Sequence, residues 1–193
     1  MAAGTIARKV LGTVKIEARV IAVGGLREDQ CEQWPEAIAA AKNEGDSLGG
    51  LIECRCTGVP AGWGEPFFSS VESEIARLAF SIPGVRGVEF GDGFAAASMR
   101  GSEHNDPIVD AAGHTARNGA GGVNGGMTNG NEIRFRVAVK PASSIAREQE
   151  SFNFRSSRME RFSVGGRHDA CIALRCPVIV EAVAAIALAE LRE

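Results

Sequence analysis

One stretch of the sequence carries most of the information about this chain, Arg117-Asn-Gly-Ala-Gly-Gly-Val-Asn-Gly-Gly-Met-Thr-Asn-Gly130. Seven glycines lie between Gly113 and Gly130. A backbone without side chains lets main-chain N–H groups approach a bulky or anionic ligand closely. The glycines therefore indicate a phosphate- or cofactor-bearing site.

The residues that follow predict a strand with a cationic end. In Ile133–Val139, two arginines alternate with apolar residues, which is typical of a half-buried strand. The strand leads into Lys140-Pro-Ala-Ser-Ser144, which supplies a cation and hydroxyls. Pro141 fixes the turn, since its ring restricts the backbone. These residues suit a phosphate or the edge of a flavin ring. The alternative is that they simply end the strand and bind no ligand.

Working outward from this strand, apolar periodicity predicts four helices and five strands. The predicted helices are Ala2–Leu11, Pro35–Asn43, Ser69–Phe80 and Val178–Leu191. The predicted strands are Ile16–Val23, Gly49–Val59, Val85–Phe90, Phe94–Gly101 and Ile133–Val139. His104–Asn118 and Ala146–Ser163 read as polar connectors. Because no clear linker interrupts the pattern, we expect one α+β domain over residues 1–193.

Composition limits the classes of function. The chain has 193 residues with 45% hydrophobic content and a net charge of −3 at pH 7, which argues against general nucleic-acid binding. No apolar run is long enough to span a bilayer, and the start lacks the pattern of a secretory signal. Five cysteines without a CxxC pair predict reduced structural thiols in a cytoplasmic protein and no metal site.

The charge is unevenly distributed along the chain. From Arg134 to Arg175 there are nine Lys and Arg against four Asp and Glu. A local basic surface on an acidic protein suits an anionic small ligand, although a solvated arginine-rich face is the alternative. Within this region Gly165-Gly-Arg-His-Asp169 combines a potential anion clamp, Arg167, with a potential base, Asp169. Neither a GxGxxG fingerprint nor a P-loop is present.

Short motifs run in a fixed order through the whole chain. They are Ala2-Ala-Gly-Thr-Ile-Ala-Arg-Lys9, Glu44-Gly-Asp-Ser-Leu-Gly-Gly50, Gly58-Val-Pro-Ala-Gly-Trp-Gly-Glu-Pro66, Gly87-Val-Glu-Phe-Gly-Asp-Gly-Phe94, Arg100-Gly-Ser102, Asn118-Gly-Ala-Gly-Gly122, Gly125-Gly-Met-Thr-Asn-Gly130, Lys140-Pro-Ala-Ser-Ser-Ile145, Gly166-Arg-His-Asp169 and Pro177-Val-Ile-Val-Glu-Ala182. In this order they resemble the chorismate synthase family.

The resemblance implies a β-α-β sandwich fold and a homotetramer. It implies conversion of 5-enolpyruvylshikimate 3-phosphate to chorismate and phosphate, the last step of the shikimate pathway. That reaction is a trans-1,4-elimination that needs reduced FMN, with NADPH as the reductant of the flavin, and gives no net redox change. The partner implied is thus a small phosphorylated substrate, with no nucleic acid and no membrane.

Motif by motif, the resemblance also assigns site residues. Flavin contacts fall on Pro83, Gly84, Gly125, Lys140, Pro141, Ala142, Ser143, Ser144 and Arg167. Asp169 matches the aspartate that assists proton removal, so it is the implied catalytic residue. Arg167 also matches a position that can address the anionic groups of the substrate.

The chain departs from the family pattern at several points. The early Gly-Glu-Ser-His-Gly motif, the arginine-rich substrate loops, a second histidine motif and the Gly-Gly-Gly-Arg-Ser-Ser-Ala-Arg flavin loop have no counterpart here. Gly119, Ala142 and Ala170 also differ from the usual family residues. We therefore expect an N-terminally truncated form of the fold. The alternative function is a truncated, non-catalytic flavin-binding or interaction protein of the same family.

Overall fold

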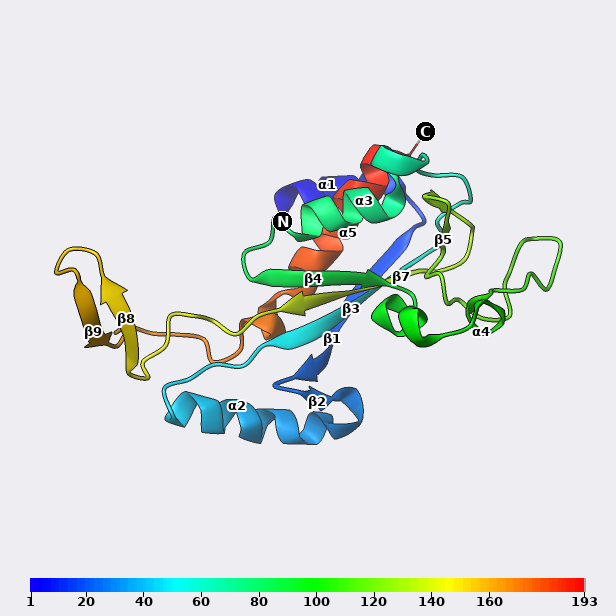
Figure 1. The fold of residues 1–193 in the computed structure, drawn as a ribbon. Helices are drawn as coiled ribbons and strands as arrows, with labels where there is room; N and C mark the ends of the chain where they lie inside the picture. Colours follow the sequence, from blue (N-terminus) through cyan, green and yellow to red (C-terminus); the bar gives the residue numbers. More distant parts are fainter. Residues whose placement is uncertain (193) are drawn as a thin grey trace.

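The computed structural model describes residues 1–192 and shows an antiparallel sheet backed by helices (Figure 1). The helices are α1 (Ala2–Leu11), α2 (Trp34–Asn43), α3 (Val71–Ala79), α4 (Gly101–His104) and α5 (Pro177–Leu191). The strands are β1 (Lys15–Val23), β2 (Leu26–Arg27), β3 (Gly50–Thr57), β4 (Val85–Phe90), β5 (Val123–Asn124), β6 (Met127–Thr128), β7 (Ile133–Val139), β8 (Gln149–Asn153) and β9 (Arg158–Phe162). The predicted α+β class is confirmed.

The main sheet has five strands in the order β2-β1-β3-β7-β4, and every neighbouring pair is antiparallel. β7 lies between β3 and β4, so its backbone is paired on both sides. Successive side chains of a strand point to opposite faces. In β7 this alternation buries Phe135 and Val137 against the helices and leaves Arg134 and Arg136 on the other face.

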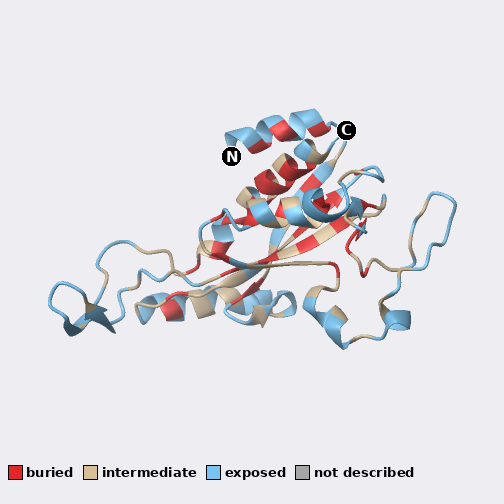
Figure 2. Cartoon of the chain, turned by 45° about the horizontal axis from the view of Figure 1, so that its top comes forward, coloured by how far each residue is buried: buried red, intermediate tan, exposed pale blue. Residues whose placement is uncertain are grey.

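α1, α3 and α5 form a layer on one face of the sheet, and the buried residues gather between that layer and the sheet (Figure 2). The 15-residue helix α5 is almost wholly apolar, which is typical of a helix covered on most sides. Gly4 lets α1 approach α5 closely, since a Cβ there would lie 2.4 Å from the Cβ of Ala182. Glu181 on α5 is held by Arg8 at 2.7 Å and by the N–H of Ala18 at 2.9 Å.

Local signals set the element ends where the sequence predicts them. The Ser70 hydroxyl accepts the N–H of Ser73 at 3.1 Å and so caps α3. Pro35 and Pro177 occupy the first turns of α2 and α5, where their missing N–H groups cost nothing.

One predicted strand is wrong. The segment predicted as the strand Phe94–Gly101 instead forms a 3₁₀ helix over Gly93–Ser98, followed by α4. The Glu89 carboxylate accepts the N–H of Phe94 at 3.0 Å, and Gly93 has a φ of 56°. These two features turn the chain out of the sheet directly after β4, and Phe94 is left 80% exposed.

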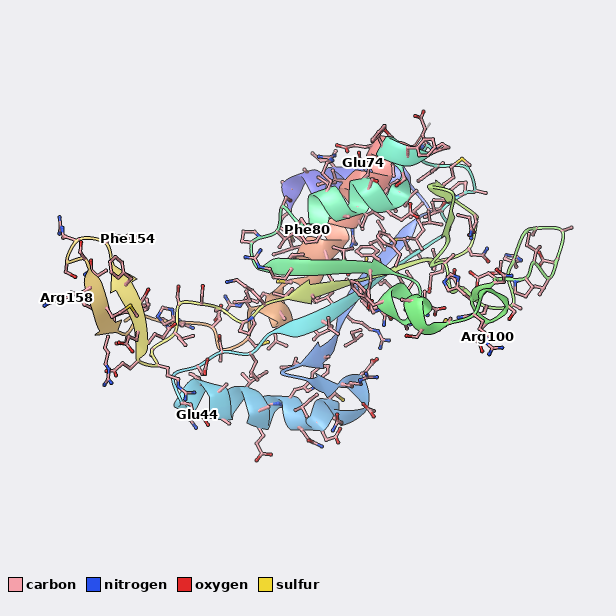
Figure 3. All side chains as sticks on the ribbon, viewed as in Figure 1. Glu44, Glu74, Phe80, Arg100, Phe154 and Arg158 are labelled. Carbon is pink, nitrogen blue, oxygen red and sulfur yellow. The ribbon has the colours of Figure 1, made fainter. Side chains whose placement is uncertain are left out.

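The predicted connector Ala146–Ser163 contains a hairpin that the sequence pattern missed, β8–β9. Its side chains are mostly polar on both faces, so apolar alternation gave no signal. The hairpin projects from the body, and Phe154 and Arg158 extend away from the sheet (Figure 3). β5–β6 lies at the opposite end of the sheet from this hairpin (Figure 1). Of the β-α-β sandwich that the family resemblance implies, the described residues thus contain one main sheet and one layer of helices.

The sheet face away from α1, α3 and α5 carries charged side chains. Glu53 on β3 lies near its centre, with an exposed side-chain fraction of 11%, and binds Arg55 at 2.7 Å and Arg19 at 3.4 Å. Burial alone would raise the pKa of Glu53, but hydrogen bonds and charge from Arg55 and Arg19 lower it below its ordinary value.

The core position of Phe135 gives a first prediction. Its side chain is fully buried and its ring centroid lies 5.6 Å from that of Phe90. Phe135→Ala is expected to lower the free energy of unfolding by about 3–5 kcal/mol because it leaves a cavity at the centre of the sheet. Urea denaturation measures this. Phe154→Ala is the control, since that ring is 90% exposed. Equal losses for the two variants would contradict the described core.

Glu53 gives a second prediction. A carboxyl with a lowered folded pKa contributes stability above its unfolded pKa of about 4.3, and that stability is lost as the pH falls through the folded value. The free energy of unfolding should therefore decrease below about pH 4.5, and Glu53→Gln should weaken this decrease. Glu150→Gln, at an exposed position on β8, should leave the pH profile unchanged. Identical profiles for wild type and Glu53→Gln would refute the assignment.

Candidate functional site

The cationic end of β7 is built around Lys140. Its N–H donates to the carbonyl of Gly84 at 2.8 Å, which joins the end of β7 to the turn that precedes β4. Gly84 has a φ of 95°, a left-handed conformation that favours glycine. The Lys140 ammonium lies 3.4 Å from the hydroxyl of Ser143. Pro83, Gly84, Lys140 and Ser143 thus lie together, as the sequence predicts.

The segment after Lys140 packs against the chain that leads into β3. The buried Ser47 hydroxyl donates to the carbonyl of Ala142 at 2.7 Å. Gly49 allows Pro141 to lie close, since a Cβ there would be 3.1 Å from the Pro141 ring. Pro141, Ser143 and the following Ser144 remain exposed. The Ser143 and Ser144 hydroxyls are therefore accessible to a ligand, on a segment that Ser47 holds in place.

Arg167 and Asp169 border the same region. They line a hollow of about 230 Å³, whose other walls are Lys42, Gly45, Asp46, Ser47, Ile145, Ala146, Gly166, His168 and Ala170. The N–H of Leu48 donates to the carbonyl of Ala170 at 2.7 Å, which ties this loop to the Ser47 segment. Arg175 binds the carboxylate of Asp169 at 3.0 Å.

Unbalanced positive charge characterises this end of the sheet. Arg147 is neutralised by Asp46 at 3.2 Å, as Arg175 is by Asp169. Within residues 1–192, no carboxylate forms an ion pair with Arg167 or Lys140, and the Lys140 ammonium has the Ser143 hydroxyl as its hydrogen-bond partner. The local field therefore favours an anion, which supports the interpretation of the basic segment as a ligand surface rather than a solvated face.

Gly125 does not lie at the Lys140 end of β7. It is exposed at the turn between β5 and β6. The base of this hairpin, at Gly122, packs against Ile133, the first residue of β7, whereas Lys140 follows the last. At about 3.3 Å per residue, β7 separates the two by roughly 20 Å. The structure therefore brings together the other predicted flavin contacts and Asp169, but it does not bring Gly125 beside them.

The glycine-rich loop borders a second and larger hollow, of about 750 Å³. It is lined by His104, Asn105, Asp106, Pro107, Ile108, Gly113, Thr115, Ala120, Asn124, Asn129 and Asn131. The Asp106 carboxylate accepts the N–H groups of Gly119 and Ala120 at 2.7 and 2.8 Å. The backbone donors of this part of the loop are thus satisfied within the chain.

Most glycines in and beside this loop are required because neighbouring backbone lies very close to them. This corrects the interpretation that they open the main-chain N–H groups to a ligand. A Cβ on Gly91 would lie 2.0 Å from the carbonyl oxygen of Gly119, and one on Gly121 would lie 2.5 Å from the Gly91 nitrogen. A Cβ on Gly122 would lie 2.4 Å from the Glu132 carbonyl oxygen. The chain itself occupies the space beside these residues, whereas the space beside Gly125 is open.

Two pairs of residues near the site were not among the predicted site residues. Ser47 and Asp46 support the site from the Glu44–Gly50 motif, and only that motif could have pointed to them. Cys171 and Cys176 lie near the site but are buried, and burial raises the pKa of both thiols, so neither is a ready nucleophile.

Two further features concern residues 1–192. No group of three or more His, Cys, Asp or Glu is placed to hold a metal ion. None of the helices in this part of the chain has both the length and the apolar content to cross a membrane.

Fold and site together define an α+β protein with exposed cationic and hydroxyl groups at one end of an antiparallel sheet. The family model of chorismate synthase matches residues 1–192. A chorismate synthase of Chitinophaga pinensis is 58% identical over 191 residues, covering 98% of this chain and 56% of that protein. One of Korarchaeum cryptofilum is 42% identical, covering 97% of this chain and 59% of that protein.

A solved structure is also similar to this chain over nearly its whole length. A crystal structure of chorismate synthase matches with a TM-score of 0.80 at 26% identity, covering 98% of this chain and 61% of that one. The chain belongs to the chorismate synthase family. It spans less than two thirds of the length of these relatives.

The packing role of the glycines can be tested with a matched pair. Gly12 and Gly91 both have positive φ, but only Gly91 has atoms within 4 Å of an added Cβ. Gly12→Ala should cost about 1–2 kcal/mol from backbone strain alone. Gly91→Ala should cost about 1–3 kcal/mol more because of the overlap with Gly119. Thermal or urea unfolding compares them, and equal costs would show that the loop is not packed as described.

Proposed function

We propose that this chain takes part in the elimination of phosphate from 5-enolpyruvylshikimate 3-phosphate to give chorismate, a carbon–oxygen lyase reaction that requires reduced FMN. Family membership over 98% of the chain supports the reaction class. The observation that carries the proposal is the cationic end of β7. There Lys140 lies beside the exposed Ser143 hydroxyl, and Ser47, which binds the Ala142 carbonyl, lines the same hollow as Arg167.

The residues present fit one end of a flavin nucleotide. The donor set comprises an ammonium, a guanidinium and the hydroxyls of Ser143 and Ser144, all of which suit phosphate or carbonyl oxygens. The hollow beside Arg167 has about 230 Å³, which is less than the roughly 300–1,000 Å³ of a complete small-molecule site. This chain would therefore hold FMN against one wall rather than enclose it.

Each residue has a distinct role in the proposal. Lys140 would neutralise negative charge, and Ser143 and Ser144 would donate hydrogen bonds. Pro83, Gly84, Pro141 and Ala142 would present backbone surface of fixed shape. Arg167 would bind the anionic groups of flavin or substrate. Reduced FMN, when bound, supplies the electron-rich partner that the elimination requires.

Asp169 is the proposed proton acceptor. Its carboxylate lies at the wall of the hollow and is oriented by Arg175 at 3.0 Å. A base must lie within hydrogen-bond reach of the proton that it removes. Asp169 would meet that condition for a substrate bound against this wall of the hollow. Gly125, about 20 Å along β7, would contact either the far end of an extended flavin nucleotide or a flavin held by another chain.

We further propose that residues 1–193 form one domain, that the chain works in the cytoplasm as a homotetramer with NADPH reducing the flavin, and that its partners include neither nucleic acid nor membrane. The family and the absence of a membrane-spanning helix within residues 1–192 support these points. The competing proposal is that the chain binds flavin without turnover. The observation that favours it is the small volume of the hollow beside Arg167, about 230 Å³, which would form only one wall of a site.

Flavin binding tests the site directly. Lys140→Ala should weaken FMN binding by at least tenfold, because it removes the cation at the strand end. Quenching of flavin fluorescence on titration with protein measures the dissociation constant. Lys9→Ala, on the exposed surface of α1, is the matched control and should bind like wild type. Unchanged binding in Lys140→Ala would place the flavin elsewhere on the chain.

Turnover tests the function. Phosphate release from 5-enolpyruvylshikimate 3-phosphate with reduced FMN under anaerobic conditions should exceed the rate without protein. Asp169→Asn should lower that rate by about 10²–10⁴ if it removes a general base, while FMN binding persists. Asp29→Asn, an exposed acid in the 3₁₀ helix after β2, is the control. FMN binding without any phosphate release would favour the non-catalytic alternative.

A further inference from the structure

Three Asn-Gly pairs lie in one stretch of this chain, with their asparagines at Asn118, Asn124 and Asn129. An asparagine that precedes glycine loses its side-chain amide more readily than others, because no side chain shields the next peptide nitrogen from the carboxamide. The three pairs are alike in sequence. They differ in hydrogen bonding and exposure, and these differences single out one of them.

Asn118 is held at both ends of its carboxamide. Its Nδ2 donates to the carbonyl of Glu132 at 2.7 Å, and its Oδ1 accepts the N–H of Gly122 at 2.7 Å. The N–H of Gly119, the residue that follows, donates to the Asp106 carboxylate at 2.7 Å, and Gly119 is buried. The nitrogen that would attack is thus kept protonated, and the carboxamide cannot turn toward it without breaking two hydrogen bonds.

Asn129 is fixed through its side chain. Its Oδ1 accepts the N–H of Asn131 at 3.0 Å and the Nδ2 of Asn131 at 3.1 Å. Its Nδ2 donates to Oδ1 of Asn124 at 2.6 Å. Asn129 is half-buried, whereas Gly130 is exposed. Three hydrogen bonds must therefore break before this carboxamide can reach the nitrogen of Gly130.

Asn124 is the least protected of the three. Within residues 1–192 its side chain makes one hydrogen bond, which Oδ1 accepts from Asn129, and its Nδ2 donates none. Asn124 and Gly125 are both exposed, and a Cβ on Gly125 would meet no described atom within 4 Å. The N–H of Gly125, the first residue of the turn, has no hydrogen-bond acceptor in the part of the chain that the structure describes. The attacking nitrogen is therefore open to solvent.

The hairpin that holds Asn124 is short enough to open locally. β5 and β6 pair through two residues each, Val123 with Thr128 and Asn124 with Met127. A hairpin this short gains little stability of its own, and local opening needs the least free energy where few contacts hold the chain. Opening of the pair beside the turn lets the Asn124 carboxamide carbon approach the nitrogen of Gly125.

We propose that Asn124 is a site of spontaneous deamidation and reacts fastest of the three asparagines. The nitrogen of Gly125 forms a bond to Cγ of Asn124 and gives up its proton, while the bond from Cγ to Nδ2 breaks. Ammonia leaves and a succinimide ring remains. Water then opens the ring at Cγ to give aspartate, or at the main-chain carbonyl to give isoaspartate. Water is the only co-reactant, and nothing is oxidised or reduced.

The two products change the hairpin in different ways. Aspartate adds a negative charge to the hollow of about 750 Å³ that Asn124 lines, where the lining residues within 1–192 include no lysine or arginine. Isoaspartate lengthens the backbone between Val123 and the turn. Val123 is buried, and its partner Thr128 donates its hydroxyl to the carbonyl of Pro60 at 2.6 Å, so a shift of this pair disturbs a packed region. The inference does not rest on flavin binding.

Deamidation rates within a single peptide test the proposal. Folded protein is kept in mildly alkaline buffer and sampled over time, with the sample at time zero as background. Trypsin cleaves after Arg117 and Arg134 and releases residues 118–134, which contain all three pairs. Fragmentation in a mass spectrometer locates the mass increase that replacement of NH2 by OH causes. Asn124 should react about fivefold faster, or more, than Asn118 and Asn129, whose hydrogen bonds must break first.

The same protein unfolded in guanidinium chloride is the matched control. Without the folded structure the three pairs should react at similar rates. A variant tests the cause of the protection, since Asp106→Ala removes the acceptor of the Gly119 N–H. In that variant the rate at Asn118 should rise about fivefold relative to the rate at Asn124 in the same molecules.

An isoaspartate-specific methyltransferase with labelled S-adenosylmethionine measures the second product. Asn124→Gln should remove most of the label from aged protein, because the longer side chain closes the ring poorly. Asn105→Gln is the control, since Asn105 is exposed and lines the same hollow but precedes Asp106 instead of a glycine. Thermal unfolding checks that each variant folds.

Several outcomes would overturn the proposal. They are a faster reaction at Asn118 or Asn129 in the folded protein, rate ratios identical to those of the unfolded control, and no change at Asn124 while the unfolded control reacts. Label that survives Asn124→Gln would also overturn it. None of these readings uses flavin or substrate, so failure of this inference is distinguishable from failure of the proposed lyase function.

Discussion

The pairing of β7 with β3 and β4 is the constraint on which the rest of the structure depends. β7 is bonded on both sides, buries Phe135 and Val137 in the core and presents Arg134 and Arg136 to the open face. Because side chains alternate strictly along a strand, a shift of one residue would exchange these two sets. The same register fixes where β7 ends, and hence where the Lys140 N–H bonds the Gly84 carbonyl. The segment that follows includes Ile145 and Ala146, which line the same hollow as Arg167.

Features governed by local periodicity could be predicted from the sequence. The alternation in Ile133–Val139 and the cap at Ser70 required no knowledge of the tertiary structure. Features governed by distant contacts could not. Phe94–Gly101 has the composition of a strand, but Glu89 accepts the Phe94 N–H and Gly93 turns the chain away from the sheet. The glycines near Gly121 suggested ligand access, whereas a backbone at overlap distance from their Cβ positions explains them.

The candidate site shows the same division. Adjacency in sequence grouped Lys140 and Ser143, whose polar atoms lie 3.4 Å apart, and the Gly-Arg-His-Asp motif selected Arg167 and Asp169, which line one hollow. The ligand roles of these residues stay predictions. Sequence motifs alone placed Gly125 in the same group, but the length of β7 separates it from Lys140. The different environments of the three Asn-Gly pairs were also invisible in the sequence, since only the folded chain gives the Gly119 N–H a carboxylate partner.

We propose that β7 positions the ligand surface at its Lys140 end. Amide hydrogen exchange with and without FMN tests this most directly, because ligand contacts slow local opening. The account predicts that amides of β3 and β7 exchange slowest without ligand, and that FMN adds protection at residues 140–147 and 166–170. Added protection confined to residues 104–131, around the larger hollow, would contradict it.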